Sequence, residues 1–337
     1  MTRIWFNRWF SVAYHYMNMI RDNADGQAFE FYGTHPDIRH MSLQACDHAE
    51  AEPVLEGFEY VQYCLDFCRR HSIDIFIPRL KMEEIGAHVT LFEEIGTKVM
   101  VCGDAELLQS ITVKDKFYEL VKDTGIVAIP AYHVVNTADA FKAAYLDLRQ
   151  RGHRVCFKPT HSEGGNGFRI IQDHRNPLEE IYGRINLNMS FEEAYSIFSL
   201  QERFDDIMVM ELLEGDEYSI DCLSDSEGKL ITAIPRRKSS GRTYHLDNIP
   251  ELASISEKVA EAYHIPYVFN IQVKYNKGVP KLLEINPRMS GGLYITCLSG
   301  INIPYLAVKT ILGQPFETPQ PKLGIRASYV EQAVLLS

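Results

Sequence analysis

Short apolar runs and helical patterns alternate along the first third of the chain. Strands are predicted at residues 3–6 and 28–32, and apolar runs of the kind found in strands buried on both faces occupy residues 73–77 and 99–102. Residues 12–22 have helical spacing, with Tyr14, Met17 and Ile20 on one side, and residues 58–71 form a stronger amphipathic pattern. Strands that alternate with helices across short turns predict a parallel, doubly wound sheet.

The turn after the first predicted strand argues against a dehydrogenase domain. Residues 7–11 read Asn-Arg-Trp-Phe-Ser, whereas the turn that holds a dinucleotide pyrophosphate reads Gly-x-Gly-x-x-Gly. We therefore expect a nucleotide-binding type of sheet that does not bind a dinucleotide at this turn.

The remainder of the chain mixes helices with strands that follow one another directly. Helical spacing is present at residues 114–121, 138–151, 191–200, 255–263 and 303–312. Strands are predicted at residues 125–130, 155–159, 169–171, 207–213, 218–223 and 230–234, and in a final pair around 270–272 and 283–286 with turn residues at 276–278. A chain of 337 residues is too long for one core, and three domains are predicted, at 1–112, 113–205 and 206–337.

Composition narrows the class of protein. The chain is 46% hydrophobic and 23% charged, which is ordinary for a soluble globular protein. Its formal charge of −11 argues against non-specific binding to nucleic acid or to an anionic membrane surface. No leader or membrane-spanning run is evident, and the seven cysteines include no Cys-x-x-Cys pair, as expected for reduced thiols. A cytoplasmic location is therefore expected.

Polar side chains gather on the last pair of predicted strands. Glu284 and Asn286 are two residues apart, so both side chains leave the same face, and Gln272 belongs to the partner strand. Carboxylate and amide oxygens of this kind suit Mg²⁺. Arg288 follows with a planar fork that suits phosphate or carboxylate. Glu-x-Asn on its own also occurs by chance at exposed strand ends.

A glycine-rich turn joins two other predicted strands. Residues 162–168 read Ser-Glu-Gly-Gly-Asn-Gly-Phe, and Lys158 ends the strand before them. Glycines allow backbone N–H groups to approach phosphate oxygens closely. Because a strand follows the turn, this is a hairpin and not a P-loop. On its own, the same sequence fits a flexible hairpin tip equally well.

The strand that ends at Leu213 is followed by Glu-Gly-Asp-Glu at residues 214–217. A strand that breaks here exposes backbone groups that could pair with the edge of an adenine. Glu217 would then accept hydrogen bonds from ribose hydroxyls, although an exposed turn carboxylate would give the same sequence.

Two further segments have sequences that are typical of anion-binding sites. Residues 235–242 (Pro-Arg-Arg-Lys-Ser-Ser-Gly-Arg) predict a mobile loop that holds an anionic substrate, and they fit a merely solvated basic loop equally well. Residues 289–292 (Met-Ser-Gly-Gly) are predicted to open a helix whose N-terminus could hold a carboxylate or phosphate.

Taken in order, these segments resemble the ATP-grasp superfamily, and most closely its carbamoyl-phosphate-synthetase-like and carboxylate–amine ligase branch. The resemblance covers about residues 110–315. It rests on Lys116, Lys158-Pro159, the glycine turn 162–168, Glu-Gly-Asp-Glu 214–217, Asn-Ile-Gln 270–272 and Glu-x-Asn-Pro-Arg 284–288. The fold that it implies is α/β, with a Rossmann-like N-terminal domain followed by a two-lobed α+β ATP-grasp fold.

The resemblance also implies a role for each matching residue. The residues that would bind ATP are Lys116, Lys158, Ser162, Gly164, Gly165, Gly167, Glu211, Leu212, Leu213, Glu217 and Gln272. The residues that would hold Mg²⁺ or Mn²⁺ are Glu284, Asn286 and Gln272, and the residues that would act on the transferring phosphoryl group are Arg288 and Lys158. Substrate contact is expected from the sequence itself at Asp221, Arg236, Arg237 and Lys238, and the resemblance adds Ser290, Gly291 and Gly292, because the family builds its substrate pockets partly after the position of Arg288. Because residues 289–292 depart from the family's pattern, the acceptor substrate cannot be carried over from a relative.

The implied reaction is attack of a carboxylate on the γ-phosphate of ATP, followed by displacement of phosphate by an amine or a similar nucleophile. Phosphoryl transfer needs positioning and charge neutralisation more than a covalent residue. The substrates would be small-molecule or peptide carboxylates and amines, and a homodimer is compatible with the resemblance. Two alternatives are a non-catalytic ATP-binding sensor or partner subunit, and an ATP-grasp kinase with Asp221 as its base.

Overall fold

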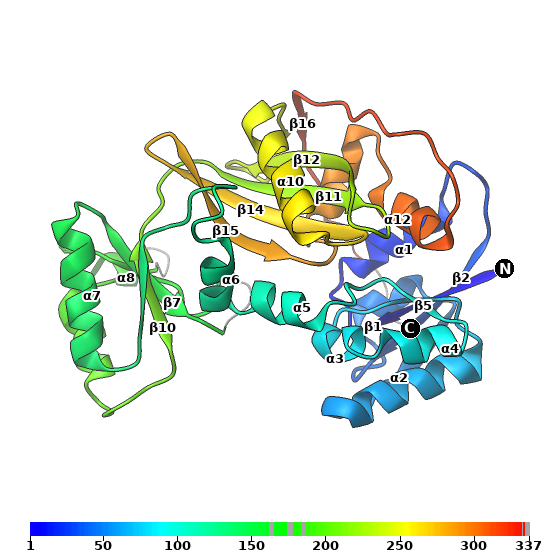
Figure 1. Cartoon of the computed structure of the whole chain (residues 1–337), viewed down its shortest axis with the longest axis horizontal. Coiled ribbons are helices and arrows are strands. Elements are labelled where there is room, and N and C mark those ends of the chain that lie inside the picture. Colours follow the sequence, from blue (N-terminus) through cyan, green and yellow to red (C-terminus); the bar gives the residue numbers. More distant parts are fainter. Residues whose placement is uncertain (162–164, 174–177, 183–186, 332, 334–337) are drawn as a thin grey trace. The chain divides into compact units, whose positions relative to one another are not determined.

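The computed structural model describes residues 1–161, 165–173, 178–182, 187–331 and 333 (Figure 1). The chain forms two compact units. Unit 1 comprises Met1–Ile111, Glu217–Gln272 and Ile285–Ser337, and unit 2 comprises Thr112–Asp216 and Val273–Glu284. The three-domain division predicted from the sequence remains a proposal.

Unit 1 begins with the predicted parallel sheet. Its strands are β1 (Thr2–Asn7), β2 (Phe29–His35), β3 (His48–Ala51), β4 (Ile75–Ile77) and β5 (Lys98–Val99). They are all parallel, in the order β3-β2-β1-β4-β5. The helices of this part are α1 (Ala13–Arg21), the 3-10 helix η1 (Met41–Ala45), α2 (Gly57–His71), α3 (Met82–Gly86), α4 (Val89–Glu94) and α5 (Ala105–Thr112). The prediction of a parallel sheet is confirmed, although β5 is shorter than expected.

Alternation along β1 explains why helices cover both faces of this sheet. Ile4 and Phe6 share a core with α1, whereas Trp5 points to the other face and stacks on Phe67 of α2, with ring centroids 4.3 Å apart. A central strand with large apolar side chains on both sides can only be buried between two layers of helices.

The buried face of α1 differs from the predicted one. Ala13, Tyr16, Met17 and Ile20 are buried, and Tyr14 is only partly buried. Tyr16 precedes Ile20 by four residues and so lies one turn away on the same face. The prediction that Tyr14 belongs to the buried face is therefore wrong, and Tyr16 takes that place.

The second sheet of unit 1 is built from hairpins. Its strands are β11 (Glu217–Ser224), β12 (Leu230–Lys238), β13 (Tyr244–Leu246), β14 (Val268–Asn276), β15 (Val279–Asn286) and β16 (Ile325–Ala327), in the order β15-β14-β11-β12-β13-β16. The helices that accompany it are α10 (Pro250–Tyr263), α11 (Leu293–Thr296), the 3-10 helix η2 (Cys297–Ser299) and α12 (Ile303–Leu312). The tip of the β14–β15 hairpin, Val273–Glu284, belongs to unit 2.

The prediction of a mobile basic loop at residues 235–242 is wrong for its first part. Strand β12 continues to Lys238, because Arg236 and Arg237 are paired both with β11 and with β13. A strand with ladder partners on both sides cannot move as a loop. Only the connection between Lys238 and β13 can form the predicted loop.

Unit 2 contains a five-stranded sheet with the order β6-β10-β7-β8-β9. Its strands are β6 (Tyr132–Val135), β7 (Val155–Pro159), β8 (Arg169–Ile171), β9 (Asn188–Met189) and β10 (Ile207–Glu211). Its helices are α6 (Lys114–Val121), α7 (Ala138–Gln150), α8 (Leu178–Tyr182) and α9 (Phe191–Phe198). Side chains of α7 and α9 pack on one face of this sheet and form its core.

Side-chain caps explain where two of these helices begin, and a proline explains why one strand begins later than predicted. Thr137 caps α7 by accepting a hydrogen bond from the N–H of Ala140 at 3.2 Å, and Ser190 forms a capping box at the start of α9. The strand predicted at 125–130 is absent from these positions, and β6 begins at Tyr132. Pro130 has no N–H to donate to a ladder, which favours a start after it.

No single described helix is long and apolar enough to cross a membrane. The segments Leu293–Ser299 and Ile303–Leu312 reach that length and apolarity only together, and they are bent by 93°.

Candidate functional site

The glycine-rich hairpin is present between β7 and β8 of unit 2. Gly165 and Gly167 both have φ of +76°, in the left-handed region that favours glycine. A Cβ atom on Gly167 would lie 2.6 Å from Cδ of Pro159, so a larger residue would not fit here. Ser162 and Gly164, two other residues of this predicted phosphate loop, lie outside the described residues.

Strand register separates Lys158 from Glu211 in the same unit. Lys158 of β7 is paired with Met208 of β10, and Glu211 is three residues further along β10. Because side chains alternate along a strand, Lys158 and Glu211 point to opposite faces of the sheet. Lys158, which is predicted to bind phosphate, and Glu211, at the predicted adenine hinge, therefore lie on different faces of this sheet.

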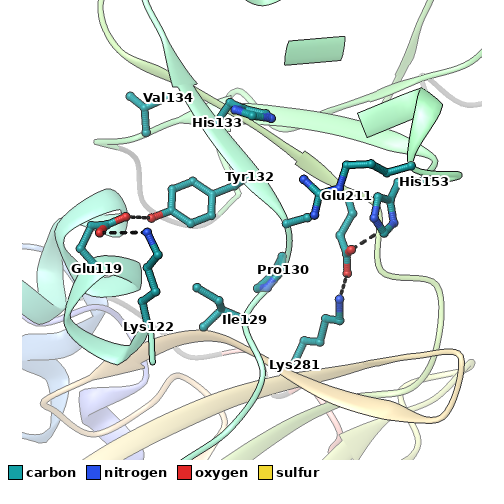
Figure 2. A pocket seen from close by; sticks show the side chains of 12 residues that line it. Glu119, Lys122, Ile129, Pro130, Tyr132, His133, Val134, His153, Glu211 and Lys281 are labelled. Atoms are coloured by element: carbon teal, nitrogen blue, oxygen red, sulfur yellow. Dashed lines mark hydrogen bonds and ion pairs between the residues drawn. The ribbon is translucent and has the colours of Figure 1, made fainter. Parts of the chain in front are cut away.

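The carboxylate of Glu211 is engaged within unit 2, at the inner end of a cleft of about 680 Å³ (Figure 2). Its side chain is 1% exposed, forms an ion pair with Nζ of Lys281, and lies with Oε2 3.1 Å from Nδ1 of His153. At the other side of this cleft, Glu119 contacts Tyr132 and Lys122 (Figure 2). The acidic groups that line the cleft are thus already paired with neighbours.

The chain beside Glu211 carries the rest of the predicted hinge. The N–H of Glu211 donates to the carbonyl of Ala131 at 2.9 Å, and the N–H of Leu212 donates to the carbonyl of Arg154 at 2.7 Å. Leu213 is buried just after the end of β10. β10 ends at Glu211, two residues before the predicted end at Leu213, and the N–H groups of Glu211 and Leu212 are already used within unit 2.

Helix α6 brings a predicted phosphate lysine to the strand of a predicted metal ligand. Lys116 is an exposed residue of α6. Two residues later, the hydroxyl of Tyr118 donates to the carbonyl of Leu283 in β15 at 3.2 Å. Burial raises the pKa of Tyr118, and the neighbouring charge of Glu284 raises it further. Unit 2 therefore places Lys116 and Glu284 on adjoining elements.

The second predicted metal ligand contacts the predicted catalytic arginine. Nη2 of Arg288 donates to Oδ1 of Asn286 at 3.2 Å, and Nη1 donates to the carbonyl of Met289, also at 3.2 Å. Ile285 is buried, whereas Glu284 and Asn286 on either side are partly exposed. This alternation agrees with the prediction that both polar side chains leave one face of β15.

The donor set on β14 and β15 has the chemistry of a magnesium site. β14, which carries Gln272, is the neighbour of β15 in the sheet. One carboxylate and two amide oxygens suit a hard cation that keeps waters and phosphate oxygens as its other ligands. Among the residues that the structure describes, no cluster of three or more His, Cys, Asp or Glu offers a competing metal site.

Three of the predicted substrate residues form a buried cluster in unit 1. Asp221 accepts hydrogen bonds from Oγ of Ser290 at 2.6 Å and from Oγ1 of Thr296 at 2.5 Å. It also accepts from Nδ2 of Asn270 at 2.9 Å and lies 3.5 Å from Nη2 of Arg236. Arg236 donates from Nε to Thr296 at 3.0 Å. The charge of Arg236 is thus neutralised inside the protein.

The other predicted substrate residues are more exposed. Arg237 lies on the opposite face of β12 from Arg236 and forms an ion pair with Asp247 at 3.4 Å. Lys238 and Gly291 are exposed, and space is open around Gly291. Glu217, the predicted ribose ligand, is exposed at the start of β11.

Sequence reasoning missed the partners of several of these residues. They are Tyr16, Asn270 and Thr296 around Asp221 and Ser290, and His153 and Lys281 around Glu211. Most of these partners are far from each other along the chain, and no local pattern marks them. Asn270 alone carried a signal, because a polar residue interrupts an apolar strand there.

The chain is similar to known proteins in sequence and in fold. A family model described as ATP-grasp in the biosynthetic pathway with Ter operon matches residues 203–333. The carbamoyl phosphate synthase large chain of Clostridium acetobutylicum is 22% identical over 215 residues, which are 60% of this chain and 18% of that protein. The same protein of Agathobacter rectalis is 25% identical over 252 residues, which are 70% of this chain and 21% of that protein. The chain thus spans about a fifth of the length of these relatives.

Solved structures show the same fold. The ADP complex of an N5-carboxyaminoimidazole ribonucleotide synthetase matches with a TM-score of 0.66 at 12% identity, over 94% of this chain and 79% of that one. The biotin carboxylase domain of the Hydrogenobacter thermophilus 2-oxoglutarate carboxylase, solved as a dimer with MgADP, ADP and bicarbonate, matches with a TM-score of 0.63 at 16% identity, over 96% and 72%. The α/β fold predicted from the motifs is confirmed, and so is the resemblance on which it rested.

Proposed function

Because the chain has the fold and the ordered motifs of the ATP-grasp superfamily, we propose that it is an ATP- and Mg²⁺-dependent ligase. In this proposal it activates a carboxylate as an acyl phosphate and joins it to an amine or a similar nucleophile. The observation that carries the proposal is the contact between Arg288 and Asn286 on the strand that also holds Glu284. An arginine fork that follows a strand with a carboxylate and an amide oxygen can supply the positioning and charge neutralisation on which phosphoryl transfer depends.

We assign the nucleotide to residues that the sequence predicted for it. Lys116, Lys158 and the glycine hairpin bind the phosphates. The adenine is bound by main-chain groups of 211–213 other than the N–H groups of Glu211 and Leu212, which donate to Ala131 and Arg154 within unit 2. The side chain of Glu211 is left out of this assignment because it is buried in its ion pair with Lys281, beside His153. Glu217 binds the ribose hydroxyls.

Glu284, Asn286 and Gln272 hold the metal ion in this proposal. When bound, Mg²⁺ supplies charge neutralisation for the phosphate oxygens. Arg288 orients the γ-phosphate and stabilises the charge on its oxygens as the carboxylate attacks in line. The bond between the β,γ-bridging oxygen and the γ-phosphorus breaks, ADP leaves, and the amine then displaces phosphate from the acyl carbon.

The acceptor is bound next to the loop after Arg288. Lys238 and Gly291 are the exposed members of the predicted substrate set, so they are the ones we assign to direct contact with a carboxylate-bearing small molecule or peptide. The solved neighbours in complex with ADP or MgADP support ATP as the co-substrate. Dimer formation, as in the biotin carboxylase domain, is part of the proposal.

The test is release of ADP and phosphate from Mg²⁺-ATP across a matrix of amino acids and small carboxylates, each with and without an amine. A ligase gives free phosphate that depends on one acid and rises with one amine. Transfer of phosphate to product without release would establish the kinase alternative. Binding of ATP by calorimetry with no turnover anywhere in the matrix would favour the sensor, and no binding of Mg²⁺-ATP would overturn the proposal.

A further inference from the structure

Tyr16 of α1 reaches a loop that lies 274 residues later in the chain. Its side chain is 0% exposed, and its hydroxyl donates a short hydrogen bond to the backbone carbonyl of Ser290. Burial raises the pKa of Tyr16 well above its usual range, and the charge of Asp221 adds to this effect. The phenol therefore keeps its proton and remains a donor.

Ser290 is held by its side chain as well as by its carbonyl. Its Oγ donates to Asp221 at 2.6 Å and accepts from Nη2 of Arg236 at 3.3 Å. The guanidinium of Arg236 also lies against Gly292, where a Cβ atom would be 2.4 Å from Cζ. Residues 288–292, which we name the Arg288 loop, are thus fixed from α1, β11 and β12 together.

The Arg288 loop carries one of the groups that orient Arg288, and Asn286 before the loop carries another. The guanidinium donates to the carbonyl of Met289, the residue directly before Ser290. A shift of Ser290 would move this carbonyl and with it the fork of Arg288. Displacement of about 1 Å in a reacting group can cost on the order of 100-fold in rate.

We propose that Tyr16 is a positioning residue that holds the Arg288 loop, and thereby Arg288, in the geometry for phosphoryl transfer. This inference rests on the proposed function for its effect on catalysis. It assigns a positioning role to a side chain of α1, and it gives Asp221, Arg236 and Ser290 a supporting role instead of direct contact with substrate.

A second buried tyrosine of unit 1 provides a matched control. Tyr60 is also 0% exposed, and its hydroxyl donates to Oε1 of Glu52 at 2.8 Å. Tyr16→Phe and Tyr60→Phe each delete one buried phenol hydroxyl and nothing else. A purely structural role for Tyr16 predicts the same consequences for both variants.

The experiment compares the two variants with the wild-type chain by steady-state kinetics with Mg²⁺-ATP and by amide hydrogen exchange of residues 288–292. For Tyr16→Phe we expect kcat to fall by at least about tenfold with KM for ATP changed by less than about twofold. We also expect faster exchange in the Arg288 loop. Tyr60→Phe should leave kcat, KM for ATP and the exchange of the Arg288 loop at wild-type values and should change only Tm.

Equal effects of the two substitutions, or unchanged exchange of the Arg288 loop in Tyr16→Phe, would overturn the proposal. Ser290→Ala is a second variant, because it removes the bond to Asp221 and leaves the carbonyl that Tyr16 contacts. Combined with Tyr16→Phe, it should lower kcat by less than the product of the two separate effects. If the wild-type chain turns over no ATP, the proposed function fails, whereas the exchange measurement still decides whether Tyr16 holds the loop.

Discussion

Arg288 donates a hydrogen bond from Nη2 to Oδ1 of Asn286 across 3.2 Å. The residue proposed to stabilise the transferring phosphoryl group is thereby attached to a residue proposed to hold the metal. An amide oxygen has two lone pairs, so Asn286 can serve the guanidinium and a cation together. The two functions are built on one short stretch of chain.

Glu284→Ala should abolish turnover while leaving the fold intact. It removes the only carboxylate among the proposed metal ligands, and the loss of several kcal/mol of charge stabilisation corresponds to a fall in kcat of at least about 100-fold. The rate of ADP release at saturating Mg²⁺-ATP measures this fall in kcat. The exposed Glu257 of α10 offers a control, because Glu257→Ala removes a carboxylate without touching this strand. Equal ADP release by Glu284→Ala and wild type would contradict the metal assignment.

Lys158→Met should weaken the binding of ATP and slow its turnover. The ammonium group is proposed to contact phosphates from one face of the unit 2 sheet, and charge-assisted hydrogen bonds of this kind contribute about 1.5–3 kcal/mol. We therefore expect Kd for Mg²⁺-ATP to rise by roughly 10- to 100-fold in calorimetry. Lys142 lies exposed on α7, which covers the opposite face, so Lys142→Met should bind ATP as the wild type does. A normal Kd for Lys158→Met would remove Lys158 from the site.

The parts of the fold and of the site that the sequence predicted are those that depend on residues close together in the chain. The strand period placed Glu284 and Asn286 on one face, and Thr137 marked the start of α7 correctly, because both effects act within a few residues. The order of the motifs was enough to predict the fold. These are properties that a single strand, cap or turn carries by itself.

The errors arose where a distant segment decided the outcome. Arg236 has the sequence context of an exposed loop, yet it is buried, where Asp221 balances its charge and Thr296 accepts a hydrogen bond from it. The helical spacing predicted Tyr14 on the face of Met17, whereas Tyr16 is the buried tyrosine and donates to Ser290. No periodicity in the sequence can report a hydrogen bond across hundreds of residues.

The pH dependence of stability should reveal the buried carboxyl of Glu52. Burial raises the pKa of Glu52, and hydrogen bonds from Thr34 and Tyr60 together with the charge of Arg8 offset this only in part. The folded chain therefore keeps the proton to higher pH than the unfolded chain, for which the pKa is about 4.3. Because the unfolded state then binds fewer protons, stability falls as pH rises from about 4.3 through the folded pKa.

Chemical denaturation of the wild type and of Glu52→Gln across this range measures the effect. The wild type should lose stability relative to Glu52→Gln as pH rises, and the difference should level off above the folded pKa. Glu30 is a control of opposite sign, since its hydrogen bond with His48 lowers its pKa. The wild type should gain stability relative to Glu30→Gln as pH rises toward about 4.3. A pH-independent difference for Glu52→Gln would contradict the raised pKa.

Lys281→Met should destabilise unit 2 strongly. It removes the ammonium group that pairs with Glu211, whose carboxylate is 1% exposed, and leaves His153 beside it. Breaking a buried ion pair by deleting one member costs about 3–5 kcal/mol, because the other charge remains buried. Since Lys281 is partly exposed, we expect the lower end of that range.

The free energy of unfolding from urea denaturation checks this expectation, and Lys277→Met is the control. Lys277 is exposed at the turn of the same hairpin, so its replacement should change stability by less than about 0.5 kcal/mol. The double variant Glu211→Gln with Lys281→Met should recover part of the loss, because no unpaired carboxylate is then buried. If Lys281→Met and Lys277→Met were equally stable, the pair would hold neither β10 nor the proposed adenine hinge in place.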